Sequence, residues 1–291
     1  MAASPMIAHK SSLTFAFISL ALFGRFAHAG AGTCGSDALE AVGSFFKLEA
    51  FYHPSAKEEG KLIAESCKFW PTDTARIITA FAYDGGGPQK KFLLAIVNSE
   101  TSEVASSYSD SLPEEDADTR IGHESVQLDT APYILSKAIR AFGVVYRIKL
   151  EPSRMAESGT GDELQLFVAE GNLIRPIFDR PLPLYYWRRE ITDCSDSCRV
   201  FDTYLTVQVL KSATNGFFDL KLTARKDDDP ENPQPKSKRT LSHTVKYDGK
   251  KFNPSSWASD IKFSCWFDPS SCSAPSKSLE ADGSAAAQLK R

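Results

Sequence analysis

Few side chains in this sequence have the type and spacing that catalysis requires. Histidine is the usual general base of hydrolases, and His123 lies in "RIGHESVQL" beside Glu124 and Ser125. Adjacent residues on a strand point to opposite faces, so this adjacency does not assemble a catalytic triad. His243 lies on the apolar side of an alternating stretch, which favours a half-buried, hydrogen-bonded histidine. No G-x-S-x-G motif is present, and we assign no catalytic residue.

Acidic side chains crowd into two segments, 114–118 (EEDAD) and 227–232 (DDDPEN). A glycosidase needs two carboxylates held about 5–10 Å apart across a cleft, and loops flanked by proline do not hold them. Calcium prefers such oxygen ligands, but neither segment has the spacing of a known calcium loop. We therefore expect two solvated acidic loops and no cofactor, with calcium as the alternative.

Aromatic and basic side chains alternate in "LYYWRRE" (184–190). On a strand, Tyr185 and Trp187 share one side, while Arg188 lies on the other and Arg189 follows it. An exposed aromatic side with arginine neighbours suits a glycan or a protein partner. The alternative is core packing beside a solvated arginine pair. These four residues are the candidate binding residues.

The six cysteines lie at Cys34, Cys67, Cys194, Cys198, Cys265 and Cys272. An even number of cysteines in an exported chain indicates disulfides. The pairing stays open, and we favour sequence neighbours: Cys34–Cys67, Cys194–Cys198 and Cys265–Cys272. Zinc is the alternative, but it typically needs a second C-x2-4-C knuckle or nearby histidines, and the sequence supplies neither. We expect no metal site.

The first 29 residues carry the pattern of a Sec-type signal peptide. Lys10 precedes the apolar run "LTFAFISLALFG", and Ala27-His28-Ala29 offers a small-x-small cleavage site. The run is shorter than the roughly 20 residues of a membrane-spanning helix, which is the alternative. We expect cleavage after Ala29 and a periplasmic or secreted protein.

Removal of that segment leaves 262 residues with 32 basic and 37 acidic side chains, a net charge of −5. Nucleic-acid binding normally requires a basic face, so we expect no nucleic-acid partner. No later segment is long and apolar enough to span a bilayer, so we expect no transmembrane segment in the mature chain.

Residues 30–71 are predicted to form a helical N-terminal element. Ser36 is placed to cap "DALEAVGSFFKLEAFY". Ser55 and Glu58 match a capping box ahead of "GKLIAESC". Two short helices folded back would bring Cys34 towards Cys67.

Residues 72–272 are predicted to form an antiparallel β domain of hairpins and meanders, in a sandwich, barrel or propeller-like arrangement. "KFLLAIVN" (91–98) is apolar on both faces, which is typical of a central strand. Gly171 separates two strands of a hairpin, and the segments 203–210, 216–225 and 240–247 form a meander. A subdivision near 190–200 stays open, and the tail 273–291 is predicted to be disordered.

The charged insert "KDDDPENPQPKSKR" between the last two strands has no apolar residue to bury, so we expect a solvated hairpin tip. Around it, "GFFDLKLTA" and "YDGKKF" (216–252) resemble a pattern of exported proteobacterial β-rich proteins of unassigned role. The same unit distantly resembles a blade of FG-GAP or VCBS-type propellers. The D-x-D-x-D-G calcium loop of those blades is absent, so no functional residue is carried over.

Together these patterns predict a disulfide-stabilised binding protein without enzymatic activity. We expect an accessory, inhibitor or immunity-type protein that binds a protein or glycan partner in the cell envelope. The alternatives are an envelope hydrolase that uses a carboxylate, His123 or His243, and a carbohydrate-binding module centred on Tyr185 and Trp187.

Overall fold

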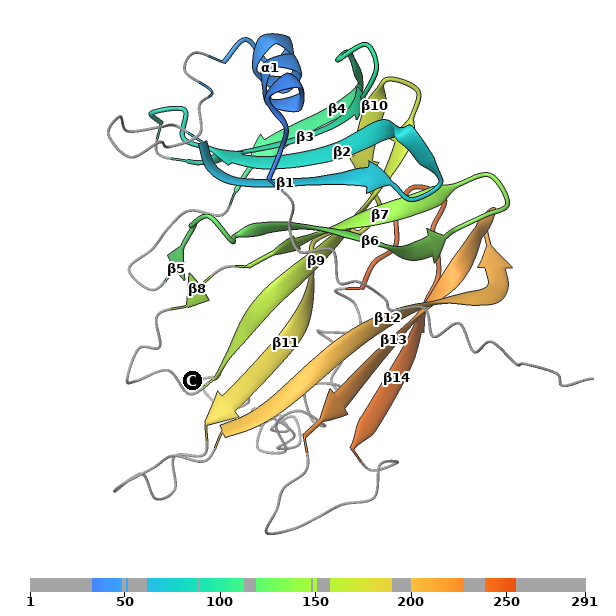
Figure 1. Cartoon of the computed structure of the whole chain (residues 1–291). Helices are drawn as coiled ribbons and strands as arrows, with labels where there is room; N and C mark the ends of the chain where they lie inside the picture. The colour runs from blue at the N-terminus through green and yellow to red at the C-terminus, as the bar shows by residue number, and fades with distance from the viewer. Residues whose placement is uncertain are drawn as a thin grey trace, which may run out of the picture. The chain divides into compact units, whose positions relative to one another are not determined.

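The computed structural model describes residues 33–48, 51, 62–87, 89–112, 119–147, 149–150, 158–189, 200–227 and 239–254. Within these ranges the chain is mainly β with one short helix, which confirms the predicted fold class (Figure 1). No helix in the described part is long and apolar enough to cross a membrane. Several predictions fall outside the described residues: the signal peptide 1–29, Ser55 and Glu58, the loop 114–118, the pairs Cys194–Cys198 and Cys265–Cys272, residues 228–238 of the insert, and the tail 273–291.

The elements follow the chain in this order: α1 Ser36–Phe45, β1 Leu62–Trp70, β2 Asp73–Tyr83, β3 Lys91–Asn98, β4 Val104–Ser111, β5 Thr119–Arg120, β6 Val126–Ile134, β7 Arg140–Tyr146, β8 Lys149–Leu150, β9 Ser158–Glu170, β10 Leu173–Pro176, β11 Leu182–Arg189, β12 Val200–Thr214, β13 Phe217–Lys226 and β14 Thr240–Val245.

Twelve of these strands belong to one sheet, and β5 pairs with β8 separately. β1 to β4 form an antiparallel meander, and β4 joins β10 through the single parallel pair Ser107–Leu173. β9 pairs with β10 and then β11 along one edge and with β7 along the other. The antiparallel pair of β9 and β10 confirms the predicted hairpin at Gly171. β11 to β14 continue the sheet, and the pairing of β12, β13 and β14 confirms the predicted final meander.

β6 pairs with β7 as a branch from β9, and it lies beside β1, the first strand of the path. The Ser66 hydroxyl accepts a hydrogen bond of 3.1 Å from the Leu128 backbone N–H, and Lys68 Nζ donates to the Leu128 carbonyl at 2.7 Å. The pairing pattern of the described residues includes no β1–β6 ladder, so the sheet is bridged here by side chains and is not closed.

β9 supplies side chains to two separate hydrophobic cores because its residues alternate between the faces of the sheet. Phe167 lies in the N-terminal core, which is built from β1–β4, β6, β7 and β10. Leu164, Leu166 and Val168 lie in the C-terminal core, which is built from β6, β9 and the strands from β11 onward. Gly143 on β7 allows this packing, since a Cβ there would lie 2.6 Å from Leu164 Cδ1.

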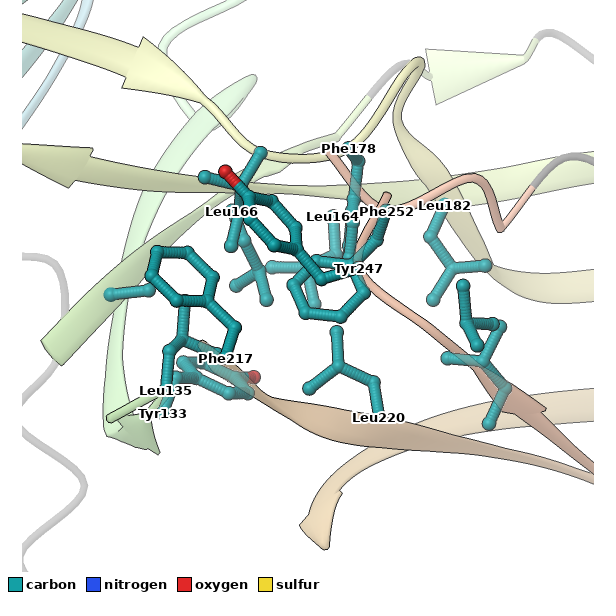
Figure 2. Packing of buried hydrophobic residues seen from close by; sticks show 14 of the residues in the cluster. Tyr133, Leu135, Leu164, Leu166, Phe178, Leu182, Phe217, Leu220, Tyr247 and Phe252 are labelled. Atoms are coloured by element: carbon teal, nitrogen blue, oxygen red, sulfur yellow. The ribbon is translucent and has the colours of Figure 1, made fainter. Parts of the chain in front are cut away.

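The C-terminal core is closed by residues that follow β14. Figure 2 shows Tyr247 and Phe252 between the side chains of β9 and those of β13. The Tyr247 ring stacks on Phe217 with centroids 4.3 Å apart, and it lies 5.2 Å from the Phe252 ring. Asp179 and Ile177 then exchange backbone hydrogen bonds with Phe252, which fixes the segment after β10.

β3 is buried on both faces, as predicted from "KFLLAIVN". Phe92, Leu94 and Ile96 enter the N-terminal core. Leu93 and Val97 lie on the opposite face in a third cluster, the helix core, beneath α1 (Figure 1). α1 buries Ala38 and Val42, so packing on this face stabilises a helix too short to persist alone.

Two local predictions in the N-terminal region are wrong. Gly35, not Ser36, is the N-cap, and no side chain caps the helix. The segment "LIAESC" belongs to strand β1, which begins at Leu62, rather than to a second helix. Its burial alternates along Leu62, Ala64 and Ser66, and antiparallel pairing with β2 outweighs its local helical tendency.

Cys34 and Cys67 form a disulfide, as predicted, with their Cα atoms 5.2 Å apart. The bond ties the segment before α1 to the middle of β1 and closes a loop of 33 residues. A disulfide of this kind is compatible with an extracytoplasmic protein.

Replacement of both Cys34 and Cys67 by serine is expected to lower the free energy of unfolding by about 3–4 kcal/mol, because the unfolded chain regains the entropy of the open loop. Urea unfolding of the chain from Gly30 onward, followed by fluorescence, measures this loss as a lower midpoint. Ser36→Ala with Ser44→Ala, both exposed on α1, is the control and should leave the midpoint unchanged. An unchanged midpoint in the cysteine variant would contradict the stabilising role.

Candidate functional site

A cavity of about 430 Å³ lies where the N-terminal core meets the segment after β10. Its apolar lining includes the buried rings of Phe92, Phe167 and Phe178. Its polar lining comes from Gln89, from β4, β7 and β9, and from Asp179 and Arg180. The volume falls in the usual range of sites for small organic ligands, roughly 300–1,000 Å³.

β9 places its polar residues in the cavity by continuing beyond the apolar part of the N-terminal core. Gln165 lies two residues before Phe167 and Glu163 lies four residues before it, so all three side chains are on the same face of β9. Glu163 pairs with Tyr146 of β7, so these two side chains lie side by side on the sheet. The Tyr146 ring contacts Phe92 edge to face at 5.3 Å, which joins the polar end to the aromatic wall.

Tyr108 and Asp110 line the side of the cavity formed by β4. The Tyr108 hydroxyl donates to Asp110 Oδ2 at 2.5 Å, and the Ser111 backbone N–H donates to Asp110 Oδ1 at 2.8 Å. Burial raises the pKa of Tyr108, and its bond to Asp110 raises that pKa further. Burial also raises the pKa of Tyr146, with smaller contributions from Tyr108 and Asp110. Both phenols therefore stay neutral at physiological pH.

Glu163 is a partly buried carboxyl group with no compensating partner. Its carboxyl group makes no hydrogen bond or ion pair within the described ranges. Desolvation by burial raises the pKa of Glu163 above its ordinary value. A perturbed carboxyl group in a cavity is typical of functional sites, because a structural carboxylate is normally paired.

Gln165 has an unsatisfied acceptor that is buried beside the same cavity. Its side chain is only 5% exposed, and Nε2 donates to the Phe178 carbonyl at 3.2 Å. This bond orients the amide, since a carbonyl accepts only from the nitrogen side. Oε1 is buried and has no hydrogen-bond partner in the described part of the chain. Such a group costs about 1–3 kcal/mol of stability, and because it has almost no accessible surface, a ligand would reach it only after the side chain moves.

Asp110 and the two histidines are not placed for catalysis in this cavity. Both oxygens of Asp110 already accept hydrogen bonds, which makes this carboxylate a poor nucleophile or general base. In the described ranges, no three His, Cys, Asp or Glu side chains come together to hold a metal ion. The two histidines considered above do not line this cavity: His123 has an 83% exposed side chain 3.7 Å from Glu124, and His243 lies on β14 opposite Leu222.

The predicted aromatic residues lie elsewhere, on the outer face of β11. Tyr185 and Trp187 share one side of the strand, as expected, and both are partly buried. Tyr185 donates to Asp202 Oδ1 at 2.5 Å and lies over Gly161, where a Cβ would approach its ring to 2.8 Å. Its ring centroid is 5.4 Å from that of Tyr204, which is 40% exposed.

Arg188 and Arg189 take part in the β11 backbone ladder, pairing with Phe201 and Val200. Their side chains lie outside the described part of the structure, so their candidate role stays a prediction. Tyr185, Trp187 and Tyr204 are called the aromatic row below.

The cavity residues escaped prediction, although one signal was present. "ELQLFVAE" has Glu163 and Gln165 in phase with Phe167, a residue whose face must be buried in a central strand. Two polar residues on the buried face of a strand indicate either the end of a core or a site. Tyr108, Asp110 and Tyr146 reach the cavity from other strands, and no local pattern connects them.

A second depression, of about 880 Å³, lies between α1 and the turn after β3. None of its lining residues is buried, and it contains no unsatisfied buried group. Its acidic side chains are solvated surface groups, so we assign it no site.

No family model matches the chain, and neither a curated protein nor a solved structure shows significant similarity to it. The geometry of the cavity and of the aromatic row is therefore the evidence on which a function rests.

Glu163→Gln is expected to stabilise the protein at about pH 7, because the amide removes a desolvated charge without changing the shape of the side chain. A raised native pKa means that the wild-type protein loses stability as pH rises from about 4 through that pKa. The difference between variant and wild type should therefore vanish at low pH and grow towards neutrality. Urea midpoints measured across this range test the prediction.

Asp162→Asn is the matched control, since it removes the same charge from the neighbouring position. Asp162 is 42% exposed and lies 3.4 Å from Arg147, so this change should be neutral or slightly destabilising. The other groups that face Glu163 are Tyr108, Asp110, Tyr146, Asp179, Arg180 and Tyr186. A Glu163→Gln variant that is less stable at neutral pH would show that the carboxylate has a stabilising partner.

Proposed function

We propose that this protein is an exported binding protein without enzymatic activity that holds a small organic ligand in the cavity between β4, β7 and β9. The observation that carries the proposal is the cavity of about 430 Å³ with the partly buried Glu163 carboxyl group in its lining, where burial raises the pKa of that group. A ligand donor at Glu163 would offset the cost of its desolvation.

The walls of the cavity support the same proposal. Phe92, Phe167 and Phe178 are at most 3% exposed and lie behind the accessible surface of the cavity, so they hold in place the partly exposed rings of Tyr108 and Tyr146 that border it. A preorganised apolar wall with a few fixed polar groups is the usual construction of a small-molecule site. The predicted signal peptide and the disulfide support a periplasmic or secreted location.

A fragment screen by amide NMR on the exported chain tests this function. We expect some aromatic fragments to shift the amides of Tyr108, Tyr146 and Gln165 together, because these residues line one cavity. Ser111→Trp should weaken the binding of those fragments tenfold or more, since Ser111 lines the cavity and the indole would narrow it. Ser109→Trp, at an exposed position of the same strand outside the lining, should leave the affinities of the fragments unchanged.

If no fragment shifts the amide signals of the cavity residues, small-ligand binding is contradicted. It is also contradicted if both tryptophan variants weaken fragment binding equally. Urea unfolding of the two variants shows whether either substitution disturbs the fold.

The aromatic row favours a second candidate function, carbohydrate binding. Tyr185 and Tyr204 lie on adjacent strands with their ring planes inclined by 37°, and Tyr204 is exposed. Asp202 next to them fixes the Tyr185 hydroxyl. Aromatic faces beside hydrogen-bonding groups bind the apolar faces of sugar rings. This row is also the described surface that best suits a macromolecular partner, which stays a prediction.

Tyr204→Ala is expected to weaken any glycan binding about fivefold, because the substitution removes one ring from the row. Affinity electrophoresis through gels that contain soluble polysaccharides measures the change. Phe69→Ala is the control, since Phe69 is 59% exposed on β1, away from the row. Equal migration of wild type and Tyr204→Ala in every gel would remove this candidate.

A further inference from the structure

The aromatic row belongs to a longer polar face that crosses β11, β12, β13 and β14, which lie in this order in the sheet (Figure 1). The strand ladders align Tyr185 with Tyr204 and Tyr204 with Arg225, so these three side chains share one face and form one row across the strands. Tyr204 and Arg225 are both exposed. A guanidinium group therefore lies beside an accessible aromatic ring.

Hydroxyl groups form the next row of this face, two residues along each strand. Thr206 is aligned with Thr223, and Thr223 is aligned with Ser242. The Thr223 and Ser242 hydroxyls are 3.1 Å apart, and Thr206 Oγ1 donates to the Thr223 backbone carbonyl at 3.4 Å. Thr206 and Ser242 are exposed. Since a hydroxyl can both donate and accept, this row offers hydrogen bonds to a ligand that is itself rich in hydroxyl groups.

Two cations lie on the same face of β13, one on each side of Thr223. Arg225 is exposed and Lys221 is partly exposed, and the four residues between them along the strand correspond to about 13 Å. Neither side chain makes a hydrogen bond or an ion pair within the described ranges. On β12, β13 and β14, the rows from Arg225 to Lys221 carry these two cations and no acid. This part of the face is therefore positively charged.

Two acids lie in the row on the other side of Arg225, and neither of them pairs with it. Asp202 Oδ1 accepts the hydrogen bond from the Tyr185 hydroxyl. Asp227 follows Arg225 by two residues and is exposed, yet the two side chains form no ion pair. The guanidinium group is thus left for a partner, and the charge of Asp227 opposes an anion that binds there.

We infer that this face binds an acidic polysaccharide, a chain of sugars that carry carboxylate groups, across β12, β13 and β14. One sugar ring stacks on Tyr204 while its carboxylate pairs with Arg225, and the hydroxyls of the next sugar bond to Thr223. Charge complementarity favours an acidic over a neutral polymer, because only the acidic polymer supplies partners for the unpaired Arg225 and Lys221. This inference rests on the carbohydrate-binding candidate and names the class of glycan.

Polygalacturonate and its methyl ester have the same backbone and differ in the charge of their carboxyl groups. Binding of the chain from Gly30 onward to each immobilised polymer is measured by biolayer interferometry at about pH 7. We expect polygalacturonate to bind at least fivefold more tightly than the ester, and this advantage should shrink as salt is added. The net charge of −5 of this chain opposes general attraction to a polyanion, so tight binding reports the local face.

Arg225→Gln and Lys221→Gln should each weaken polygalacturonate binding about threefold or more and leave binding of the ester unchanged. Asp227→Asn should strengthen polygalacturonate binding, because it removes the opposing charge. Lys137→Gln is the matched control and should change neither affinity, since Lys137 is an exposed lysine in the turn between β6 and β7.

Equal binding of the acid and the ester would overturn the acidic class and leave the carbohydrate-binding candidate standing. Unchanged polygalacturonate binding in Arg225→Gln would place the glycan elsewhere and overturn the inference. Tighter binding of a single-stranded oligonucleotide than of polygalacturonate would assign the face to nucleic acid instead. Failure of both polymers would overturn the inference, and if in addition no polysaccharide gel retards the wild type, the carbohydrate-binding candidate falls as well.

Discussion

The structure depends on one strand that packs on both faces. β9 directs Leu164, Leu166 and Val168 into the C-terminal core and Phe167 into the N-terminal core, so neither core is complete without it. Its two edges are occupied as well, by β7 on one side and by β10 and β11 on the other. A strand held in this way cannot shift its register by one residue without exchanging the two sets of side chains.

That constraint also creates the cavity. Because β9 is longer than the N-terminal core that it covers, the positions in phase with Phe167 continue past the apolar side chains and are occupied by Gln165 and Glu163. An apolar pair at these positions would extend the core and stabilise the protein. The chain instead keeps an unpaired buried amide oxygen and a desolvated carboxyl group. Polar groups that cost stability in the free protein are typical of sites that a ligand completes.

The sequence predicts the parts of this fold that depend on local alternation and fails where distant segments compete. The period of two identifies β3, the hairpin at Gly171 and the last meander, because each pairs with its neighbour in the chain. The segment "LIAESC" is compatible with a helix in isolation, and only its ladder with β2 makes it a strand. The cavity is harder still to predict, because five separated segments supply its polar lining and no local pattern connects them.

Phe252 in the C-terminal core is connected to the cavity residue Gln165 by backbone hydrogen bonds to the segment 177–179. The Tyr247 ring stacks on Phe217 and contacts Phe252, whose backbone bonds to Ile177 and Asp179 hold the segment between them. That segment presents the Phe178 carbonyl to the Gln165 amide nitrogen, and this bond fixes the orientation of the amide beside the cavity. A carbonyl in another position would let the amide turn. The position of this polar side chain is therefore set by packing between residues far apart in the sequence.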